Sequence, residues 1–339
     1  MTRLFTDGAE HGSELAILRK TVVTPISTTY KRTGNYSYVC VGVNEKYIEF
    51  AIGSESEFYI RASVCFVYGT SGAPLGGIKW MANTTVLGYI QFSTDGFPKI
   101  YVGTTLKTTL SDVPAFLPDT FYLVEIHVII HDTTGTIELK INGVQAGSWM
   151  GDTKPGADTD ATAIAIYHNG GASGQGCAYF DDIAVNNTAE AVDNSWCGDG
   201  HVIALKPNAN GDSSDFTGSD GNSTDNYLLV DDVPHDSDTT YVESATADHT
   251  DLYNLAACGL SNVEIQRVLV EAIAKDTDTA DGTVKLLSKA GSTTSETSVD
   301  LSTSYALYKG TEMLVNPDDS AAWETSDLDA LQAGIKVVD

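Results

Sequence analysis

The chain has 339 residues, 42% of them hydrophobic, so it is long enough for two folded domains and is not a disordered polymer. Its 19 Lys and Arg stand against 46 Asp and Glu, for a formal net charge of −27. This balance excludes nucleic acid and anionic membranes as expected partners, because phosphate binding needs clustered cations. Residues 1–195 carry a net of −8 (12 − 20), and residues 196–339 a net of −19 (7 − 26).

The five cysteines are scattered without a CxxC pair, which predicts free thiols and neither a disulfide framework nor a zinc site. Cys40 and Cys65 fall within apolar strand patterns, so we expect both to be buried. No run of about 18 apolar residues occurs, and the first residues lack the apolar core of a signal peptide. We therefore expect neither membrane insertion nor Sec-dependent secretion.

The first 190 or so residues predict many short strands separated by clusters of Gly, Asn, Asp and Ser. The expected strands are 21–30, 36–43, 47–52, 57–68, 75–81, 86–93, 97–103, 121–131, 136–142, 144–149, 161–168 and 177–185. No interval combines helical periodicity with caps. This pattern is typical of a two-sheet antiparallel sandwich or jelly roll.

The clearest stretch is 121–147, which predicts two consecutive hairpins. One face of its first strand is apolar and is formed by Tyr122, Val124, Ile126, Val128 and Ile130. The opposite face includes Glu125, His127 and His131 and is expected to be partly exposed. Asn142 and Gly143 tolerate positive φ, so they predict a tight second turn.

The second half predicts a different set of elements. Residues 211–238 hold eight Asp and no Lys or Arg, which favours a solvated loop with a short strand at 226–230. Further strands are expected at 263–274, with a bulge near Gln266 and Arg267, at 282–288, at 304–315, and around Ile335 and Val337. A short helix is expected from Ser326, as its cap, to Gln332, with Trp323 buried just before it.

These elements predict three ranges: a jelly-roll domain at 1–195, an acidic linker or loop at 196–240, and a smaller C-terminal β-sandwich at 241–339, whose start could lie as early as 200. The fold class expected is thus all-β, with one short helix.

Several segments carry a resemblance. LFTDGAE, GNYSY, TTGTIELKINGV and AYFDDIAVNN together resemble a laminin-G-like, concanavalin-A-like jelly roll, in the version found in virion proteins of tailed bacteriophages. The second half, with GDGHVIALKPNANGDSSDF, DTTYVESATADHTDLYNL, LSTSYALY and AAWETSDLDALQAGIKV, is similar to the β-rich region that follows in such proteins. The resemblance implies a non-enzymatic virion structural protein, either a capsid decoration or a tail accessory component. It also implies location in the virion, homo-oligomerisation, and other virion proteins and host-surface polysaccharide as partners.

Two other functions stay open: a receptor-binding adhesin for host-surface glycan, and a glycan-degrading enzyme. The sequence lacks G-x-S-x-G, the P-loop and the Rossmann fingerprint. It also lacks the E-x-D-x-x-E pattern of concanavalin-A-like glycosidases, to which Glu55-Ser-Glu57 is the nearest approach. We therefore expect no catalytic residues and no enzyme activity.

Glycan sites combine exposed aromatic side chains with nearby polar groups. The residues expected near loops or strand ends that could serve are Trp80, Tyr89, Trp149, Tyr167 and His168. The alternative for each is ordinary packing in the core or an interface.

Metal sites have weaker support. Glu125, His127 and His131 share a strand face, but two His and one acid on an outward face favour a polar surface over a metal centre. Asp152, Asp158 and Asp160 could line a calcium site at a loop rim, with no motif fixing them. The pair Asp181–Asp182 is expected to pin a turn by hydrogen bonds. No other cofactor is expected.

Overall fold

The computed structural model describes residues 3–69, 75–93, 95–113, 115–170, 176–278 and 282–338. Strands account for 49% of the residues and helices for 3%, which confirms the predicted all-β class. The chain forms two compact units, Met1–Ile203 and Ala204–Asp339. Among the described residues, no helix is long and apolar enough to cross a membrane.

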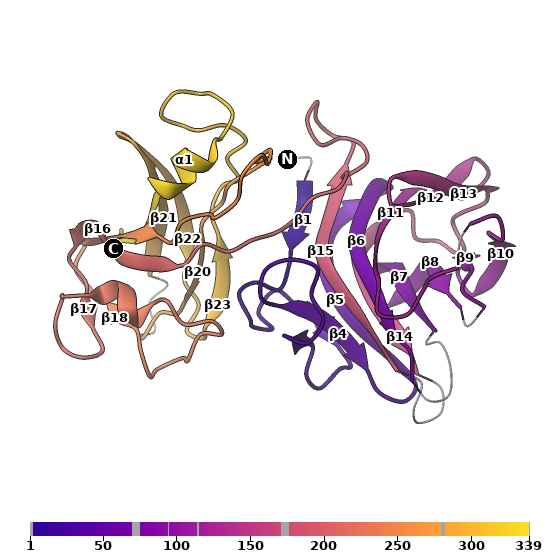
Figure 1. The fold of residues 1–339 in the computed structure, drawn as a ribbon, viewed down its shortest axis with the longest axis horizontal. Helices are drawn as coiled ribbons and strands as arrows, with labels where there is room; N and C mark the ends of the chain where they lie inside the picture. The colour runs from indigo at the N-terminus through magenta and orange to yellow at the C-terminus, as the bar shows by residue number, and fades with distance from the viewer. Residues whose placement is uncertain are drawn as a thin grey trace. The chain divides into compact units, whose positions relative to one another are not determined.

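The first unit consists of two antiparallel sheets (Figure 1). The eight-stranded sheet contains, in spatial order, β13 (Val144–Gly151), β12 (Gly135–Ile141), β11 (Phe121–Ile129), β6 (Glu57–Val67), β15 (Cys177–Asn187), β4 (Ser37–Val41) and β3 (Ile26–Ser27), with β1 (Arg3–Asp7) paired to β15. The seven-stranded sheet contains β10 (Thr105–Thr109), β9 (Pro98–Val102), β8 (Thr85–Phe92), β7 (Leu75–Ala82), β14 (Ala161–Asn169), β5 (Glu45–Glu55) and β2 (Arg19–Lys20).

The predicted hairpins at 121–147 are confirmed as β11, β12 and β13. Val124, Ile126 and Val128 are fully buried and pair with the apolar residues of β12, as period-2 alternation requires. Asn142 and Gly143 turn between β12 and β13 with φ of 50° and 76°, the left-handed region that this tight turn needs.

The core of the first unit lies between the two sheets. Alternate residues of each strand point into it, and they are mainly Val, Ile, Leu and Ala side chains with aromatic rings among them. The largest side chains fully buried in this core include Trp80, Tyr38, Phe50, Phe58 and Phe180. All five cysteines are free, and Cys40 and Cys65 are buried as predicted. The unit is an antiparallel jelly-roll sandwich.

The second unit is a smaller β structure. Its main sheet contains β16 (Pro207–Ser214), β19 (Thr250–Leu255), β24 (Gln332–Val337), β21 (Thr283–Ala290) and β22 (Thr293–Asp300). Two-stranded sheets pair β17 (Thr217–Gly218) with β18 (Val242–Glu243), and β20 (Glu271–Ala274) with β23 (Ala306–Lys309). The short helices are η1 (Asn226–Leu229), a 3-10 turn, and α1 (Thr325–Asp329).

Several local predictions for the second unit need correction. Helix α1 is capped by Glu324, whose backbone N–H donates to Asp327, so Ser326 lies inside the helix, and Gln332 already begins β24. The strand predicted at 226–230 is the 3-10 turn η1, and only the end of the strand predicted at 263–274 forms, as β20. Trp323 is buried as predicted, and its indole N–H donates to the carbonyl of Met313 at 3.1 Å.

The aspartate-rich stretch within the predicted linker 196–240 is folded where β16, β17 and η1 form. One buried carboxylate, Asp251 on β19, organises it. Asp251 accepts hydrogen bonds from the backbone N–H of Phe216 (2.8 Å), the side-chain amide of Asn226 (2.7 Å) and the hydroxyl of Tyr253 (2.9 Å). A buried carboxylate with three donors fixes the loop that surrounds it.

Candidate functional site

The middle of the outer face of the eight-stranded sheet, over β6, β11 and β12, is covered by the chain itself. Residues 188–203, which follow β15, return across this face. Trp196 packs edge-on against Tyr59 and His127, with ring centroids 5.5 and 5.9 Å away, and the Lys140 ammonium lies 3.8 Å from the Trp196 ring centroid. The backbone N–H of Gly198 donates to Glu125 at 2.8 Å. The segment therefore covers Tyr59, Glu125 and His127 in the middle of this face.

His127 lies under that segment and is only 8% exposed, so the half-exposed polar face predicted here is wrong. Its two ring nitrogens contact Glu138 (2.8 Å) and Glu57 (3.0 Å), and its ring stacks on Tyr59 at 4.1 Å. His131 faces elsewhere and accepts backbone N–H groups of the following turn. Nowhere in the described ranges do three or more His, Cys, Asp or Glu converge in a way that could hold a metal ion.

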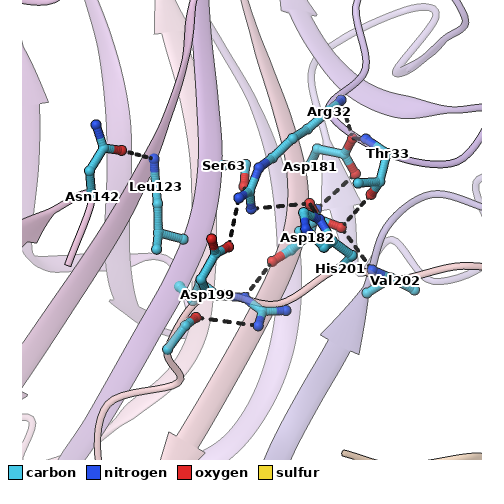
Figure 2. A network of polar contacts seen from close by, with 12 residues as sticks. Arg32, Thr33, Ser63, Leu123, Asn142, Asp181, Asp182, Asp199, His201 and Val202 are labelled. Carbon is cyan, nitrogen blue, oxygen red and sulfur yellow. Dashed lines mark hydrogen bonds and ion pairs between the residues drawn. The ribbon is translucent and has the colours of Figure 1, made fainter. Parts of the chain in front are cut away.

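A buried polar network fixes the end of the same segment (Figure 2). It centres on Asp182, which lies at an irregularity in β15 with a φ of 50°. Asp182 accepts hydrogen bonds from the Thr33 hydroxyl (2.9 Å) and the backbone N–H of Val202 (2.8 Å). The Arg32 guanidinium lies 3.5 Å from the same carboxylate and 2.6 Å from Asp199. The network connects β15 to the loop before β4 and to the returning segment.

Asp181, the neighbour of Asp182, gives a pH-dependent prediction. Burial and then the charge of Asp182 raise its pKa to about 7, despite hydrogen bonds donated by the backbone N–H groups of Arg32, Thr33 and Asp182. A carboxyl whose pKa is higher in the folded than in the unfolded state loses its stabilising contribution as the pH rises from about 4 to about 7. Over that window the wild type should lose about 2–4 kcal/mol of stability relative to Asp181→Asn.

Chemical denaturation of both proteins across this pH range measures the difference. Above about pH 8 the gap between them should stay constant, because Asp181 is then ionised in both the folded and the unfolded state. If the free energies of unfolding of the two proteins change with pH in parallel, the raised pKa of Asp181 is contradicted.

The outer face of the seven-stranded sheet has a different character. It carries a cluster of aromatic and polar side chains that we call the tyrosine face, formed by Tyr47, Lys79, Tyr89, Gln91, Tyr101 and Tyr167. The strand register places these residues in two cross-strand rows. One row runs Lys99, Gln91, Gly77, Tyr167, Tyr47, and the other runs Tyr101, Tyr89, Lys79, Ala165, Glu49, Arg19.

The rings of Tyr89 and Tyr101 stack across β8 and β9, with centroids 4.3 Å apart and planes 10° apart. The hydroxyl of Tyr101 donates to the Gln91 side chain at 3.4 Å. The Lys79 ammonium lies 4.3 Å from the ring centroid of Tyr167 and 5.7 Å from that of Tyr89. The result is one connected patch of rings, hydroxyls, an amide and an ammonium group.

Two small residues keep this patch compact. Gly77 separates Gln91 from Tyr167 in the first row, and a side chain there would collide with the backbone carbonyl of Ile90. Ala165 occupies the corresponding place in the second row, beside Lys79. The small residues let the long side chains of neighbouring strands lean toward each other.

The phenols of Tyr89 and Tyr167 are proton donors at neutral pH. Burial, followed by the proximity of Tyr101 and Glu45, raises the pKa of Tyr89 to about 12. Burial raises the pKa of Tyr167 well above its ordinary value, and a contact with Gln91 opposes the shift. Tyr89, Gln91 and Tyr101 are half-buried, so part of each side chain reaches solvent.

The structure brings only two of the five predicted glycan residues together. Tyr89 and Tyr167 share the tyrosine face, with ring centroids 6.0 Å apart, but Tyr167 is only 1% exposed, so of the two Tyr89 is the one that a ligand reaches. Trp80 and His168 are fully buried, because each is adjacent in sequence to an outward residue and so points into the sandwich. Trp149 lies on β13 of the other sheet, half-buried, with the Lys107 ammonium 5.0 Å from its ring centroid.

The predicted calcium residues do not converge. Asp152 and Asp158 are exposed, and Asp160 is half-buried. Asp152 accepts the backbone N–H of Lys154, and Asp160 accepts the hydroxyl of Thr159. These are local turn contacts, and they leave no shared space for a cation among the three.

Comparison with known proteins gives likenesses of fold only. No family model matches the chain, and no curated protein matches it. Among solved structures it is similar to the cellulose induced protein Cip1 (13% identity, TM-score 0.43, covering 58% of this chain and 100% of that one). It is also similar to an endo-β-1,4-glucuronan lyase from Trichoderma reesei (11%, 0.41, 55% and 96%) and to a sialidase (10%, 0.39, 56% and 19%). The chain thus spans about a fifth of the sialidase.

The comparisons correct the function expected from the sequence. They return proteins named for glycan chemistry, so the prediction of a non-enzymatic virion structural protein is wrong, and the virion and bacteriophage attribution gains no support. The expected lack of enzyme activity is not confirmed either. The segments that suggested the virion role follow the strand-and-turn pattern of the jelly roll, which many functions share.

Proposed function

We propose that the first unit is a carbohydrate-binding module that holds a polysaccharide on the tyrosine face. The observation that carries the proposal is the stacked pair Tyr89–Tyr101, half-buried beside the Gln91 amide. Rings supply apolar surface for the C–H faces of a sugar, and hydroxyls and amides match its hydroxyl groups. An extended sheet face suits a polymer that lies along it.

Binding is favoured over cleavage by the chemistry of the same side chains. Abstraction of a proton from a sugar ring needs a base whose pKa lies near the working pH. Tyr89 has a pKa of about 12, so it is protonated at neutral pH, and Tyr167 is displaced further in the same direction. The ammonium of Lys79 is held by Glu45 at 2.6 Å. These groups donate hydrogen bonds, and none of them is poised to remove a proton.

Affinity electrophoresis through gels containing soluble polysaccharides tests the proposal. The wild type should be retarded by at least one neutral or acidic polymer, and Tyr89→Ala or Tyr101→Ala should reduce the retardation about tenfold, the size of one lost stacking contact. Tyr227→Ala, which truncates a half-buried tyrosine of the second unit, serves as the matched control and should migrate as the wild type does.

Retardation that both tyrosine-face variants retain in full would contradict the proposal. So would a wild type that no polymer of a broad panel retards. Release of unsaturated or reducing ends during incubation with a bound polymer would show cleavage and replace the binding module with an enzyme.

A further inference from the structure

The three cations of the two cross-strand rows, Lys79, Lys99 and Arg19, each have an anionic partner. The Lys79 ammonium contacts Glu45 at 2.6 Å, and the Lys99 ammonium contacts Asp95 at 3.0 Å. Arg19 makes a two-pronged contact with Glu49, in which its Nε donates at 2.8 Å. Within the part of the chain that the structure describes, the two cross-strand rows thus offer no uncompensated positive charge.

In two of these ion pairs the carboxylate side chain is more exposed than the lysine side chain. The Lys79 side chain is 9% exposed, whereas its partner Glu45 is 42% exposed. Lys99 is 21% exposed and Asp95 is 47% exposed. A ligand that approaches this face therefore meets negative charge before it reaches either ammonium group.

Two further features strengthen the repulsion by Glu45 and Asp95, whose carboxylates we call the acidic fringe. Hydrogen bonds from Ser93 and then from Lys99 lower the pKa of Asp95 to about 2, so this carboxylate stays ionised at all ordinary pH values. The whole chain carries a formal net charge of −27, and such a field slows the approach of a polyanion at low salt. Repulsion of a polyuronide would thus act both at the face and at a distance.

We infer that the tyrosine face selects neutral glycans and rejects polyuronides and other anionic polysaccharides. This inference rests on the proposed function. A neutral sugar meets rings, phenol hydroxyls and the Gln91 amide, all of which bind without a charged partner. A polyuronide would place one carboxylate per sugar against Glu45 and Asp95, or would have to displace them from Lys79 and Lys99. The acidic fringe thus acts by exclusion, as specificity elements often do.

Parallel affinity electrophoresis on alginate and on soluble neutral glucans, mannans and galactans, at low and at high salt, tests this selectivity. We expect retardation by a neutral polymer that salt does not alter, and none by alginate. The double variant Glu45→Gln/Asp95→Asn should gain alginate binding roughly three- to tenfold, because it frees Lys79 and Lys99, and the gain should vanish at high salt.

The outcomes are distinct. Wild-type binding to alginate that equals or exceeds binding to every neutral polymer would overturn the selectivity and leave the carbohydrate-binding module standing. Failure to bind any polymer of either kind would overturn the carbohydrate-binding module and the selectivity with it. A double variant that folds as the wild type does but gains no alginate binding would show that the fringe does not set the selectivity.

Discussion

Replacing Asp182 by Ala should lower the free energy of unfolding of the first unit by about 3–5 kcal/mol. The side chain is fully buried and accepts hydrogen bonds from Thr33 and Val202 while it faces Arg32. Truncation leaves these donors and the guanidinium without their central acceptor, and the cost of an unpaired buried group exceeds the net value of the contact. Ala is also disfavoured at the φ of 50° that residue 182 adopts.

Urea denaturation followed by intrinsic fluorescence measures this loss. Asp199→Ala is the matched control, because Asp199 contacts the same guanidinium but is 62% exposed, and an exposed pair contributes only about 0–1 kcal/mol. Equal effects of the two substitutions would mean that the ion pairs of Arg32 set the stability of this region, and that the hydrogen bonds from Thr33 and Val202 to Asp182 do not.

Replacing Trp80 by Ala should cost about 3–5 kcal/mol, the usual range for removing a large aromatic side chain from a core. Trp80 is fully buried in the sandwich, where it lies opposite Gly88 on β8, and any side chain at Gly88 would collide with the indole. The ring therefore fills a space for which the neighbouring strand is shaped. Thermal or urea denaturation should show a large loss of stability.

Trp80→Phe separates packing from polar contacts. Within the described residues the indole N–H of Trp80 has no hydrogen-bond partner, so Phe removes a buried unsatisfied donor while it keeps most of the volume. We expect this variant to lose only about 1–2 kcal/mol. A Trp80→Ala protein that keeps full stability but loses glycan binding would place this residue in the site, contrary to its burial.

Alternation along single strands was enough to predict much of the first sheet. Val124, Ile126 and Val128 face the core, and Asn142–Gly143 turns the chain, because both properties depend on residues close in sequence. The same rule applied to β7 and β14 separates outward Lys79 and Tyr167 from inward Trp80 and His168. The prediction that grouped Tyr167 with His168 overlooked this rule, since adjacent residues of a strand point to opposite faces.

The composition of the tyrosine face could not be predicted in this way. Tyr101, Gln91 and Lys79 become neighbours of Tyr167 only through the registers that join β9, β8, β7 and β14. Those registers depend on long-range pairing and on bulges, of which the sequence gives no local sign. Lys79 and Tyr101 were therefore missed, although the alternation around Ile78 and Trp80 marks Lys79 as outward.

The sequence also did not predict that residues 188–203 cover the middle of the outer face of the eight-stranded sheet. His127 was expected at a wet surface because its own strand alternates, and its cover comes from Trp196, almost 70 residues later. Burial by a distant segment changes the surroundings of a side chain without changing its pattern along the strand.

The return of this segment also decides how the first unit bears mechanical load from the rest of the chain. β15 runs through the middle of its sheet and ends at Asn187, yet the covalent path toward Ala204 first passes Trp196 and then Val202, whose N–H is held by Asp182. A force applied through Ala204 thus acts on the Val202–Asp182 hydrogen bond before it can separate any strand from its sheet. The segment therefore reduces the tension that reaches the central strand β15.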